Sequence, residues 1–397
     1  MFEEIQEAPA DPILGLMEVY AADPRENKVN LTVGVYQDEA GRTPVLPTVR
    51  EAAADLLAQE KTKSYLPITG PPELGKAVRG LLFGPDSTLV GGGRAITAQT
   101  PGGTGGLRIS GDFLRNHQPE ARIWLSDPTW PNHPAIFRAS GLSIATYPYL
   151  DQETGRLDTA AMLAALREIP AGDVVVLHGC CHNPTGVDPD QATWQEIAEI
   201  AAEQGWLPLV DLAYQGFGAG LDQDVQGLRA IADRVPEFLV CSSFSKIFGL
   251  YRERVGAMTL VAANPAHAQA ALSQIKIAIR TSYSNPPAHG GQLVSTILLD
   301  PERATRWRAE LGGMRERIQA MRGGLADALR AAGARGDFEF LREQRGMFSL
   351  LGVTREQVDA LREDHAVYLV GSGRINVAGL APDNLDLVAR AIVAVGG

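Results

Sequence analysis

Cysteine is scarce in this sequence. The chain of 397 residues has only Cys180, Cys181 and Cys241, and no two of them are spaced as CxxC. Neighbouring residues of a strand point to opposite faces, so Cys180 and Cys181 are not expected to converge on one ligand. The scarcity predicts no disulfide framework and no metal site, and it favours a reducing compartment, the cytoplasm.

An excess of positive charge and long apolar segments are also lacking. The 36 Lys and Arg residues are outnumbered by 47 Asp and Glu, which gives a net charge of -11. Nucleic-acid binding usually requires a basic face. No apolar run approaches the roughly 20 residues of a membrane helix, and the acidic start, MFEEIQEAPADP, has no features of a secretory signal. We therefore expect neither a nucleic acid nor a membrane as partner.

Short apolar runs alternate with helical patterns through the centre of the chain. The apolar runs predict buried strands at 121–127, 142–149, 173–179, 207–213, 237–243 and 256–263. The helical patterns occupy 159–169, 190–205 and the segment after Pro265. Such alternation predicts an α/β fold, in which a mostly parallel sheet is covered by helices.

The pattern changes from about residue 301. Residues 301–333 have the spacing of a long amphipathic helix, which we expect to be interrupted near Gly312 and Gly313. A further helix is predicted at 354–365, and a last one leads to the end of the chain. These segments indicate a second, smaller unit of α+β type.

Three domain segments follow from these patterns. Residues 44–312 are expected to form a large domain and residues 313–397 a small C-terminal one. Residues 1–43 are expected to form an N-terminal arm and part of the small domain, because the strand-like segment VNLTVGVY lies outside the βα alternation.

Polar side chains follow several of the predicted strands. Asn183 comes after the strand at 173–179, Asp211 and Tyr214 end or follow the next one, and Lys246 follows the strand at 237–243. In a parallel α/β sheet, ligands bind beyond the carboxyl ends of the strands. These side chains are therefore expected at one site.

A glycine-rich turn, TPGGTGGLR, precedes these strands and opens a helix. Backbone N–H groups of such a turn, at the positive end of a helix dipole, suit a phosphate. Pyridoxal phosphate requires such a cradle, a lysine for its aldehyde and a carboxylate for its ring nitrogen. Lys246 and Asp211 would supply the last two. Burial near cations lowers the pKa of a lysine such as Lys246 and leaves its amine nucleophilic.

The other contacts to this cofactor are assigned by their chemistry. We expect Asn183 and Tyr214 at the ring oxygen, Trp130 on the ring face, and Gly103, Thr104, Ser243, Ser245 and Arg254 around the phosphate.

Each of these residues has a simpler explanation when it is taken alone. Lys246 is compatible with an ordinary lysine at a strand end, Asp211 with a helix N-cap and Asn183 with a turn. Trp130 is more often a core residue. Glycine-rich turns also occur in dinucleotide sites, but GxGxxG is missing from a βαβ setting near the N-terminus, which disfavours an oxidoreductase.

In sequence order, the chain resembles the class I, fold type I aminotransferases for aspartate and aromatic amino acids. The matching stretches are VNLTVGVYQDE, KSYLPITG, TPGGTGGLR, SDPTWPNH, LHGCCHNPTG, DLAYQGFG, SSFSK, GLYRERVG, SYSNPPAHGGQ, QRGMFS and GRINVAGL. The resemblance implies a mostly parallel seven-stranded sheet, pyridoxal 5'-phosphate as cofactor, a homodimer with shared active sites and ping-pong transamination between amino acids and 2-oxo acids. It implies catalytic roles for Lys246, Asp211 and Tyr214.

The resemblance also implies residues that bind the substrate. Arg374 matches the arginine that binds the α-carboxylate, and Arg280 matches the one that reaches a side-chain carboxylate from the partner subunit. Tyr65 matches a tyrosine lent across the dimer to the cofactor phosphate. The remaining matches are Gly34 on a mobile segment, Phe348, Trp130 and Asn183 in the substrate pocket, and His133 and His178 around the ring and its aspartate.

Substrate preference is left open by the same comparison. Val35, Thr43, Thr104 and Asn285 resemble the aspartate-preferring pattern. Gln37 and Ser64 depart from it, since lysine and asparagine are expected there. We predict a transaminase that transfers amino groups from aspartate, from aromatic amino acids or from both to 2-oxoglutarate. A lyase or decarboxylase that uses the same cofactor is the alternative, and a silent binding protein is disfavoured by the presence of Lys246 and Asp211.

Overall fold

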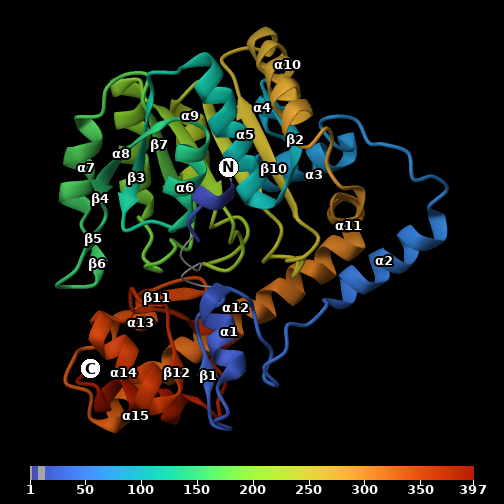
Figure 1. The fold of residues 1–397 in the computed structure, drawn as a ribbon. Coiled ribbons are helices and arrows are strands. Elements are labelled where there is room, and N and C mark those ends of the chain that lie inside the picture. The colour runs from blue at the N-terminus through green and yellow to red at the C-terminus, as the bar shows by residue number, and fades with distance from the viewer. Residues whose placement is uncertain (1, 8–13) are drawn as a thin grey trace.

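A seven-stranded sheet forms the centre of the computed structural model, which describes residues 2–7 and 14–397 (Figure 1). The strand order is β2-β10-β9-β8-β7-β3-β4. β10 is antiparallel to both of its neighbours, whereas the other adjacent strands are parallel. The bounds are β2 Ala95–Pro101, β3 Arg122–Asp127, β4 Ser143–Pro148, β7 Val174–His178, β8 Leu207–Leu212, β9 Phe238–Ser243 and β10 Val255–Val261. The predicted α/β fold with a mostly parallel sheet is confirmed.

Six of the seven strands coincide with predicted apolar runs, and β2 does not. Its sequence, AITAQTP, contains the buried polar residues Gln99 and Thr100 and the half-buried Thr97. The hydroxyls of Thr97 and Thr259 lie 2.9 Å apart across β2 and β10. Gln99 donates a hydrogen bond of 2.7 Å to the carbonyl of Pro287. Polar residues in a buried strand interrupt the continuous apolar run by which such strands are recognised in a sequence. They are tolerated here because each finds a hydrogen-bond partner.

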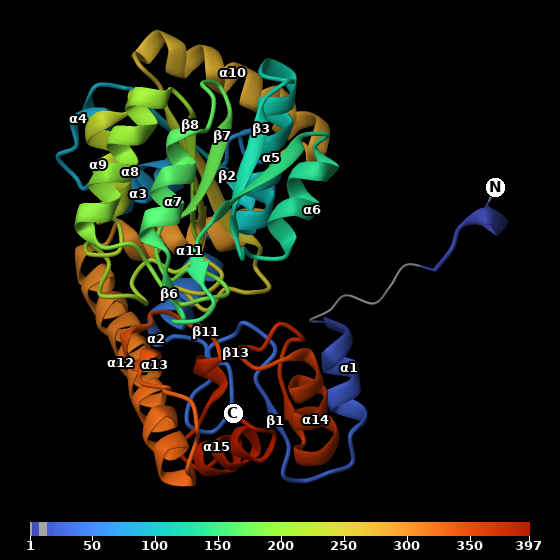
Figure 2. The same cartoon turned by 90° about the vertical axis from the view of Figure 1, so that its left-hand side faces the viewer.

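Helices cover both faces of the sheet (Figures 1 and 2). In β7, Val174 and Val176 pack into one core while Val175 and Leu177 pack into the other, as the alternation of a strand requires. The first core is completed by α5 Gly102–His117, α6 Asn132–Ala139 and α10 Pro265–Ser282. The second core is completed by α3 Pro72–Phe83, α7 Thr159–Arg167, α8 Gln191–Gln204, α9 Gln226–Arg234 and α11 Ala288–Leu298.

The helix α12 runs without a break from Pro301 to Ala332. It begins at the cap Asp300, whose side chain accepts hydrogen bonds from the backbone N–H groups of Glu302 and Arg303, and it ends at Gly333 in the left-handed conformation. The predicted interruption near Gly312 and Gly313 is wrong. A mid-helix glycine costs only about 1 kcal/mol, and the helix buries large side chains on both sides of the pair: Trp307, Leu311, Met314 and Ile318.

The elements after α12 gather with residues 14–30, which include α1 and β1, at the lower end of the molecule (Figure 1). β1 Val29–Asn30 pairs in parallel with β12 Val367–Tyr368, and β11 Phe348–Leu350 pairs antiparallel with β13 Arg374–Asn376. The early strand-like segment thus joins the C-terminal elements. The helix predicted at 354–365 is α14 Arg355–His365, whose N-terminus is held by a capping box of Thr354 and Gln357.

The remaining elements are short or connect these layers. They are η1 Phe2–Glu4, α1 Leu14–Ala22, α2 Pro47–Gln59, α4 Thr88–Gly91, β5 Leu150–Asp151, β6 Arg156–Leu157, α13 Phe340–Glu343, η2 Val377–Gly379 and α15 Leu385–Ala394. No helix among the described residues is both long and apolar enough to cross a bilayer. The domain boundaries at 43/44 and 312/313 stay predictions. The second falls inside α12, and positions 1 and 8–13 of the predicted arm lie outside the described residues.

Candidate active site

A cavity of about 280 Å³ lies at the edge where the parallel strands end. Thirteen of the fifteen predicted site residues line it: Gly34, Gly103, Thr104, Trp130, Asn183, Asp211, Tyr214, Ser243, Ser245, Lys246, Arg254, Phe348 and Arg374. His178 lines it as well. Residues that are far apart in the chain are therefore brought together at the place expected for an α/β fold.

The reversed direction of β10 explains how Arg254 reaches this edge. β10 begins with Val255 where β2 ends, since Val255 pairs with Pro101. Arg254 therefore precedes β10 at the edge where β8 and β9 end, and Gly102 follows β2 at the same place. The ends of β2, β7, β8 and β9 and the beginning of β10 thus supply residues that line the cavity.

The turn at Gly102 and Gly103 has the shape of a phosphate cradle. A Cβ atom on Gly102 would lie 2.4 Å from Nη2 of Arg254, and one on Gly103 would lie 3.1 Å from Cβ of Ser243. Gly102 also has a positive φ of 74°. Pro101, the N-cap of α5, makes no side-chain hydrogen bond to the helix among the described residues, which leaves the first N–H groups of α5 available. Bare backbone, an arginine and serine hydroxyls together fit a phosphate.

Arg254 is held in place from its own side of the cavity. Its Nη1 donates to the carbonyl of Tyr251 at 2.9 Å and to Oγ of Ser245 at 3.3 Å. The backbone N–H of Ser245 in turn lies 3.4 Å from Oγ of Ser243. These contacts hold the guanidinium of Arg254 and the hydroxyls of Ser243 and Ser245 together at the cavity, where they can bind an anion.

Lys246 is partly accessible from the cavity, and its environment favours the neutral amine. Burial lowers the pKa of Lys246 to about 8; the negative charge of Asp211 opposes this shift, and Arg254 and Arg374 add to it. Its Nζ lies 5.2 Å from the centre of the Tyr214 ring. A neutral amine in a cavity lined by polar groups can react with an aldehyde.

Asp211 ends a chain of hydrogen bonds through two histidines. Nε2 of His133 lies 2.9 Å from Oδ2 of Asp211, and Nδ1 of His133 lies 2.9 Å from the hydroxyl of Thr129. That hydroxyl is also 3.2 Å from Nε2 of His178. Burial raises the pKa of Asp211, but the hydrogen bond from His133 and the positive charge of Lys246 help to outweigh burial and hold the pKa below its usual value. An ionised carboxylate can hold a protonated ring nitrogen.

His178 stays neutral in this arrangement. Burial and the nearby His133 lower the pKa of His178 to about 3, against a smaller opposing effect of Asp211. It therefore contributes hydrogen bonding and no charge near the cavity.

Arg374 is a buried residue that lines the same cavity. It donates to Oδ1 of Asn183 at 3.2 Å and to the carbonyl of Thr32 at 2.7 Å, and it lies 4.2 Å from the centre of the Phe348 ring. Its buried Nε has no hydrogen-bond partner within residues 2–7 and 14–397. A buried guanidinium with an unpaired donor suits a carboxylate, since that anion can accept two parallel hydrogen bonds.

Two of the predicted residues do not line the cavity. Tyr65 is 92% exposed. Arg280 lies in the last turn of α10, is exposed and hydrogen-bonds Ser284. Both were expected to act on the site of a partner subunit, and neither closes the cavity of its own chain.

Four residues that line the cavity were not predicted as site residues: Leu107, Cys180, Ala213 and Tyr251. Tyr251 accepts a hydrogen bond of 2.8 Å from the backbone N–H of Tyr36. Burial raises the pKa of Tyr251 to about 12, so its phenol remains protonated. The sequence signal for Tyr251 was its place between Lys246 and Arg254.

Of the six positions considered for substrate preference, only Thr104 lines the cavity. Asn285 instead donates a hydrogen bond of 2.9 Å to the carbonyl of Leu66.

The protein family described as aminotransferase class I and II matches residues 26–392. The chain belongs to this family. An aspartate aminotransferase of Salmonella typhi is 54% identical to this aminotransferase over 395 residues, which cover 100% of both chains. An aromatic-amino-acid aminotransferase of Pseudomonas aeruginosa is 48% identical over 394 residues, 99% of this chain and 98% of its own.

Solved structures agree with the sequence relatives. The crystal structure of an aromatic-amino-acid aminotransferase from Burkholderia pseudomallei, covalently bound to pyridoxal phosphate, matches with a TM-score of 0.98 and 48% identity over 100% of each chain. The predicted family, the aminotransferase activity and the cofactor, pyridoxal phosphate, are confirmed. The cavity described above has a cradle, an amine and a carboxylate that fit this cofactor.

Proposed function

We propose that this aminotransferase moves the amino group of aspartate and of aromatic amino acids to 2-oxoglutarate, in two half-reactions at one site in the cytoplasm. The observation that carries the proposal is that Arg374, Lys246 and Asp211 line the same cavity. A carboxylate bound by Arg374 would hold an α-amino acid beside the amine of Lys246. Relatives of similar identity are named for aspartate and for aromatic amino acids, which supports both substrate classes.

The cofactor would be held from three sides. Gly103, Thr104, Ser243, Ser245 and Arg254 would bind its phosphate, Asn183 and Tyr214 its ring oxygen, and Trp130 the face of its ring. Asp211 would hold the ring nitrogen protonated, and His133 keeps the carboxylate ionised and oriented. When bound, the cofactor supplies an aldehyde for the amino group and a ring that accepts electrons from the substrate Cα.

The chain's own residues would bind the substrate and move its proton. Arg374 would bind the α-carboxylate, and its contact with Asn183 would align that carboxylate with the ring. Lys246 would first hold the cofactor, then, as a free amine, move a proton from the substrate Cα to the cofactor carbon. A pKa of about 8 suits a group that must both take up and release a proton near neutrality. Gly34 and Phe348 would enclose the substrate.

A half-reaction titration tests this function. The protein loaded with pyridoxal phosphate receives aspartate or phenylalanine without any 2-oxo acid, and absorbance follows conversion of the bound cofactor to its amine form. We expect conversion by both. Conversion by aspartate alone would restrict the enzyme to acidic substrates. No conversion by either, with the chromophore bound, would contradict the proposal and favour a lyase. The Lys246→Ala variant should convert the bound cofactor far more slowly than the wild type. Lys276→Ala, at an exposed site on α10, is the control and should convert it at the wild-type rate.

We further propose a homodimer in which Arg280 and Tyr65 act on the partner's site. Both side chains are exposed and lie outside the cavity of their own chain. Arg280 would bind the side-chain carboxylate of a dicarboxylic substrate, and Tyr65 the cofactor phosphate. A dimer also accounts for exposed aromatic surface such as Tyr65.

Mixing two inactive variants tests this arrangement. Lys246→Ala and Arg280→Ala chains are combined, dissociated and reassociated, and aspartate transamination is measured. If Arg280 serves the partner, one site of each mixed dimer has both wild-type residues, so activity should return to about one quarter of the wild-type level. If Arg280 serves its own chain, the mixture stays as inactive as its components. An active monomer in sedimentation would also contradict the proposal.

A further inference from the structure

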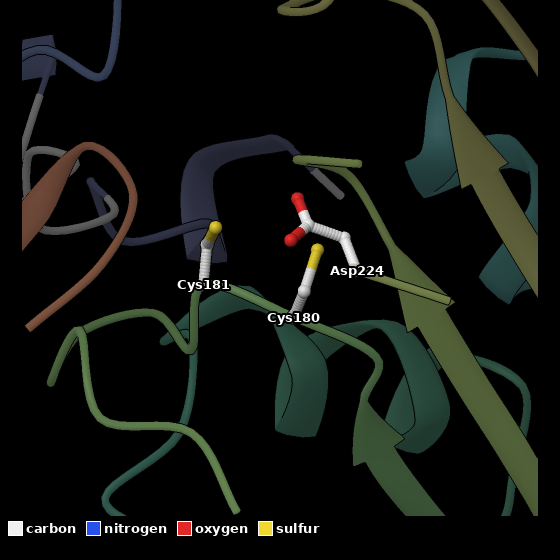
Figure 3. Close-up of side chains that lie close together, drawn as sticks. All are labelled: Cys180, Cys181 and Asp224. Atoms are coloured by element: carbon white, nitrogen blue, oxygen red, sulfur yellow. The ribbon is translucent and has the colours of Figure 1, made fainter. Parts of the chain in front are cut away.

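Cys180 and Cys181 point into the same space as Asp224, as Figure 3 shows. The two Sγ atoms and a carboxylate oxygen of Asp224 all lie within 4.8 Å of one another. The sequence interpretation that the two thiols point apart is therefore wrong. Both cysteines follow the end of β7 at His178 instead of lying on it, and Cys181 has a positive φ of 52°, which turns the chain.

This unusual turn is fixed by contacts of the backbone. Oδ2 of Asp188 accepts a hydrogen bond of 2.7 Å from the N–H of Cys181, and Oδ1 accepts one of 2.9 Å from the N–H of His182. On the other side, a Cβ atom on Gly346 would lie only 2.3 Å from Cβ of Cys181. A non-glycine residue at positive φ is uncommon and needs such support. The two sulfurs are consequently held together before any ligand arrives.

Both thiols are buried and lie close together, and the Cys181 thiol donates to the carbonyl of Tyr214 at 3.9 Å. The hydrogen bond that Cys180 gives to Cys181 raises the pKa of Cys180 well above its usual value, and burial adds to the shift. Burial raises the pKa of Cys181 to about 11, against the opposing effect of the hydrogen bond from Cys180. Thiols of this kind are poor nucleophiles, so the pair is not an activated cysteine. Two sulfurs and a carboxylate oxygen within 4.8 Å of one another are a donor set that suits a soft cation, which would displace the thiol protons.

Asp224 adds negative charge beside the sulfurs. Its Oδ2 accepts hydrogen bonds from the N–H groups of Gly216 and Gly218, and its Oδ1 accepts from those of Ala219 and Gly220. Four backbone donors keep the carboxylate in one orientation. Its charge faces the two sulfurs and would favour a cation there.

We propose that Cys180 and Cys181 form a two-thiolate site for a soft divalent cation of the zinc and cadmium type, with Asp224 as the facing charge. Two metal–sulfur bonds of about 2.3 Å at a tetrahedral angle place the sulfurs about 3.8 Å apart, which lies within the 4.8 Å limit that the three ligand atoms meet. Binding breaks two S–H bonds and forms two metal–sulfur bonds. Both protons pass to the solvent, and no electron is transferred.

The ion would enter through a second cavity, of about 470 Å³, that both Cys180 and Asp224 line. Asp188, Asp190 and Glu343 also line it, so its entrance attracts cations, although Arg156 and Arg345 oppose them. Cys180 lines the active-site cavity as well. The proposed site therefore lies in the wall between the two cavities, three residues before Asn183, and an ion bound there should restrain the turn that carries Asn183 and inhibit transamination.

Titration of the holoenzyme with cadmium chloride tests the site. We expect one ion per chain, the ultraviolet charge-transfer band of cadmium–thiolate bonds, and release of about two protons per ion at neutral pH. Cys180→Ser and Cys181→Ser should each weaken binding by more than about 100-fold, because loss of a direct ligand exceeds the effect of outer contacts. Cys241→Ser removes the third buried thiol, which is not part of the cluster, and should leave the affinity unchanged.

For each variant, transamination with cadmium is divided by the activity of the same variant without the ion. This inhibition is then compared with the affinity of the variant for cadmium. Loss of inhibition in Cys180→Ser and Cys181→Ser, with retention in Cys241→Ser, is the expected result. Unchanged affinity in both serine variants, or binding without the thiolate band and without proton release, would overturn the proposal. The band and proton release are measured on the wild-type protein, so the test holds even if a variant fails to fold. Neither readout depends on the identity of the amino-acid substrate.

Discussion

Nε2 of His133 lies 2.9 Å from Oδ2 of Asp211, and both side chains are almost completely buried. His133 is also joined through Thr129 to His178, so the orientation of Asp211 depends on a connected set of groups on three segments. Buried polar groups of this kind are costly when one partner is removed. The contact therefore gives a direct way to test how Asp211 is positioned.

Replacing His133 by alanine should weaken cofactor binding. Asp211 would lose its hydrogen bond, its pKa would rise, and it would hold the ring nitrogen less firmly. A hydrogen bond to a charged group contributes about 1.5–3 kcal/mol, so we expect cofactor affinity to fall by roughly 10- to 100-fold. Fluorescence titration with pyridoxal phosphate measures this. His267→Ala, at an exposed position of α10, is the control. Equal affinities in all three proteins would show that His133 does not position Asp211.

The stability of the cofactor-free protein should depend on Lys246 above pH 8. The pKa of Lys246 is about 8 when folded, against the usual 10.5. Between these values the unfolded chain binds more protons, so the free energy of unfolding rises with pH. The full gain is at most about 3 kcal/mol. Denaturation at fixed protein concentration should show that this rise is missing in Lys246→Met and present in Lys276→Met. An identical pH dependence in Lys246→Met and the wild type would refute the lowered pKa.

A side chain at Gly34 should disturb Phe348. A Cβ atom there would lie 2.6 Å from Cζ of Phe348, so Gly34→Ala forces the ring to move. Overpacking costs about 1–3 kcal/mol, and we expect KM for the amino-acid substrate to rise by about tenfold. The double variant Gly34→Ala/Phe348→Leu should recover part of this loss. Gly313→Ala, where a Cβ meets nothing within 4 Å, is the matched control. Steady-state kinetics in which the double variant is no better than the single one would rule out the clash.

Arg322 should be essential for the strand that carries Phe348. The side chain is 1% exposed and donates to the carbonyls of Gly346 and Phe348, each at 2.7 Å, and to Oγ of Ser349 at 2.5 Å. Arg322→Met leaves these acceptors without a donor, and we expect the free energy of unfolding to fall by about 3–5 kcal/mol. Urea denaturation measures this loss. Arg335→Met, on the loop after α12, should change stability by less than about 0.5 kcal/mol. A loss in Arg322→Met no larger than in this control would contradict the role of Arg322.

Much of the sheet could be predicted because its strands are apolar on both faces. Val174, Val175, Val176 and Leu177 give a continuous apolar run, and each of the two cores receives alternate members. The strand β2 was missed because its polar residues find partners that only the folded sheet supplies. The continuity of α12 was missed for a related reason. The prediction considered only the low helix propensity of Gly312 and Gly313. It did not include the burial of large side chains on both sides of this pair, which stabilises the helix.

The cavity was predicted from the positions of residues relative to strand ends, which topology brings to one edge. Lys246 and Asn183 each follow a strand of the same parallel set, and Asp211 lies within such a strand, one residue before the end of β8. Tyr251 was not found, because it lies in an irregular segment where no periodicity indicates its direction. The convergence of Cys180 and Cys181 was not predictable from spacing either. It depends on a positive φ, stabilised by Asp188 across the turn.

The uninterrupted length of α12 has a mechanical consequence. A helix of 32 residues is about 48 Å long, and this one reaches from beside the sheet to the C-terminal elements (Figure 2). Because this helix has no break, a rotation at one end is transmitted to the other end. A tilt of about 5° at its first turn would carry its last turn through about 4 Å. A change of under 1 Å at its first turn would thus become a larger displacement at its last turns, which pack against α13 and α15.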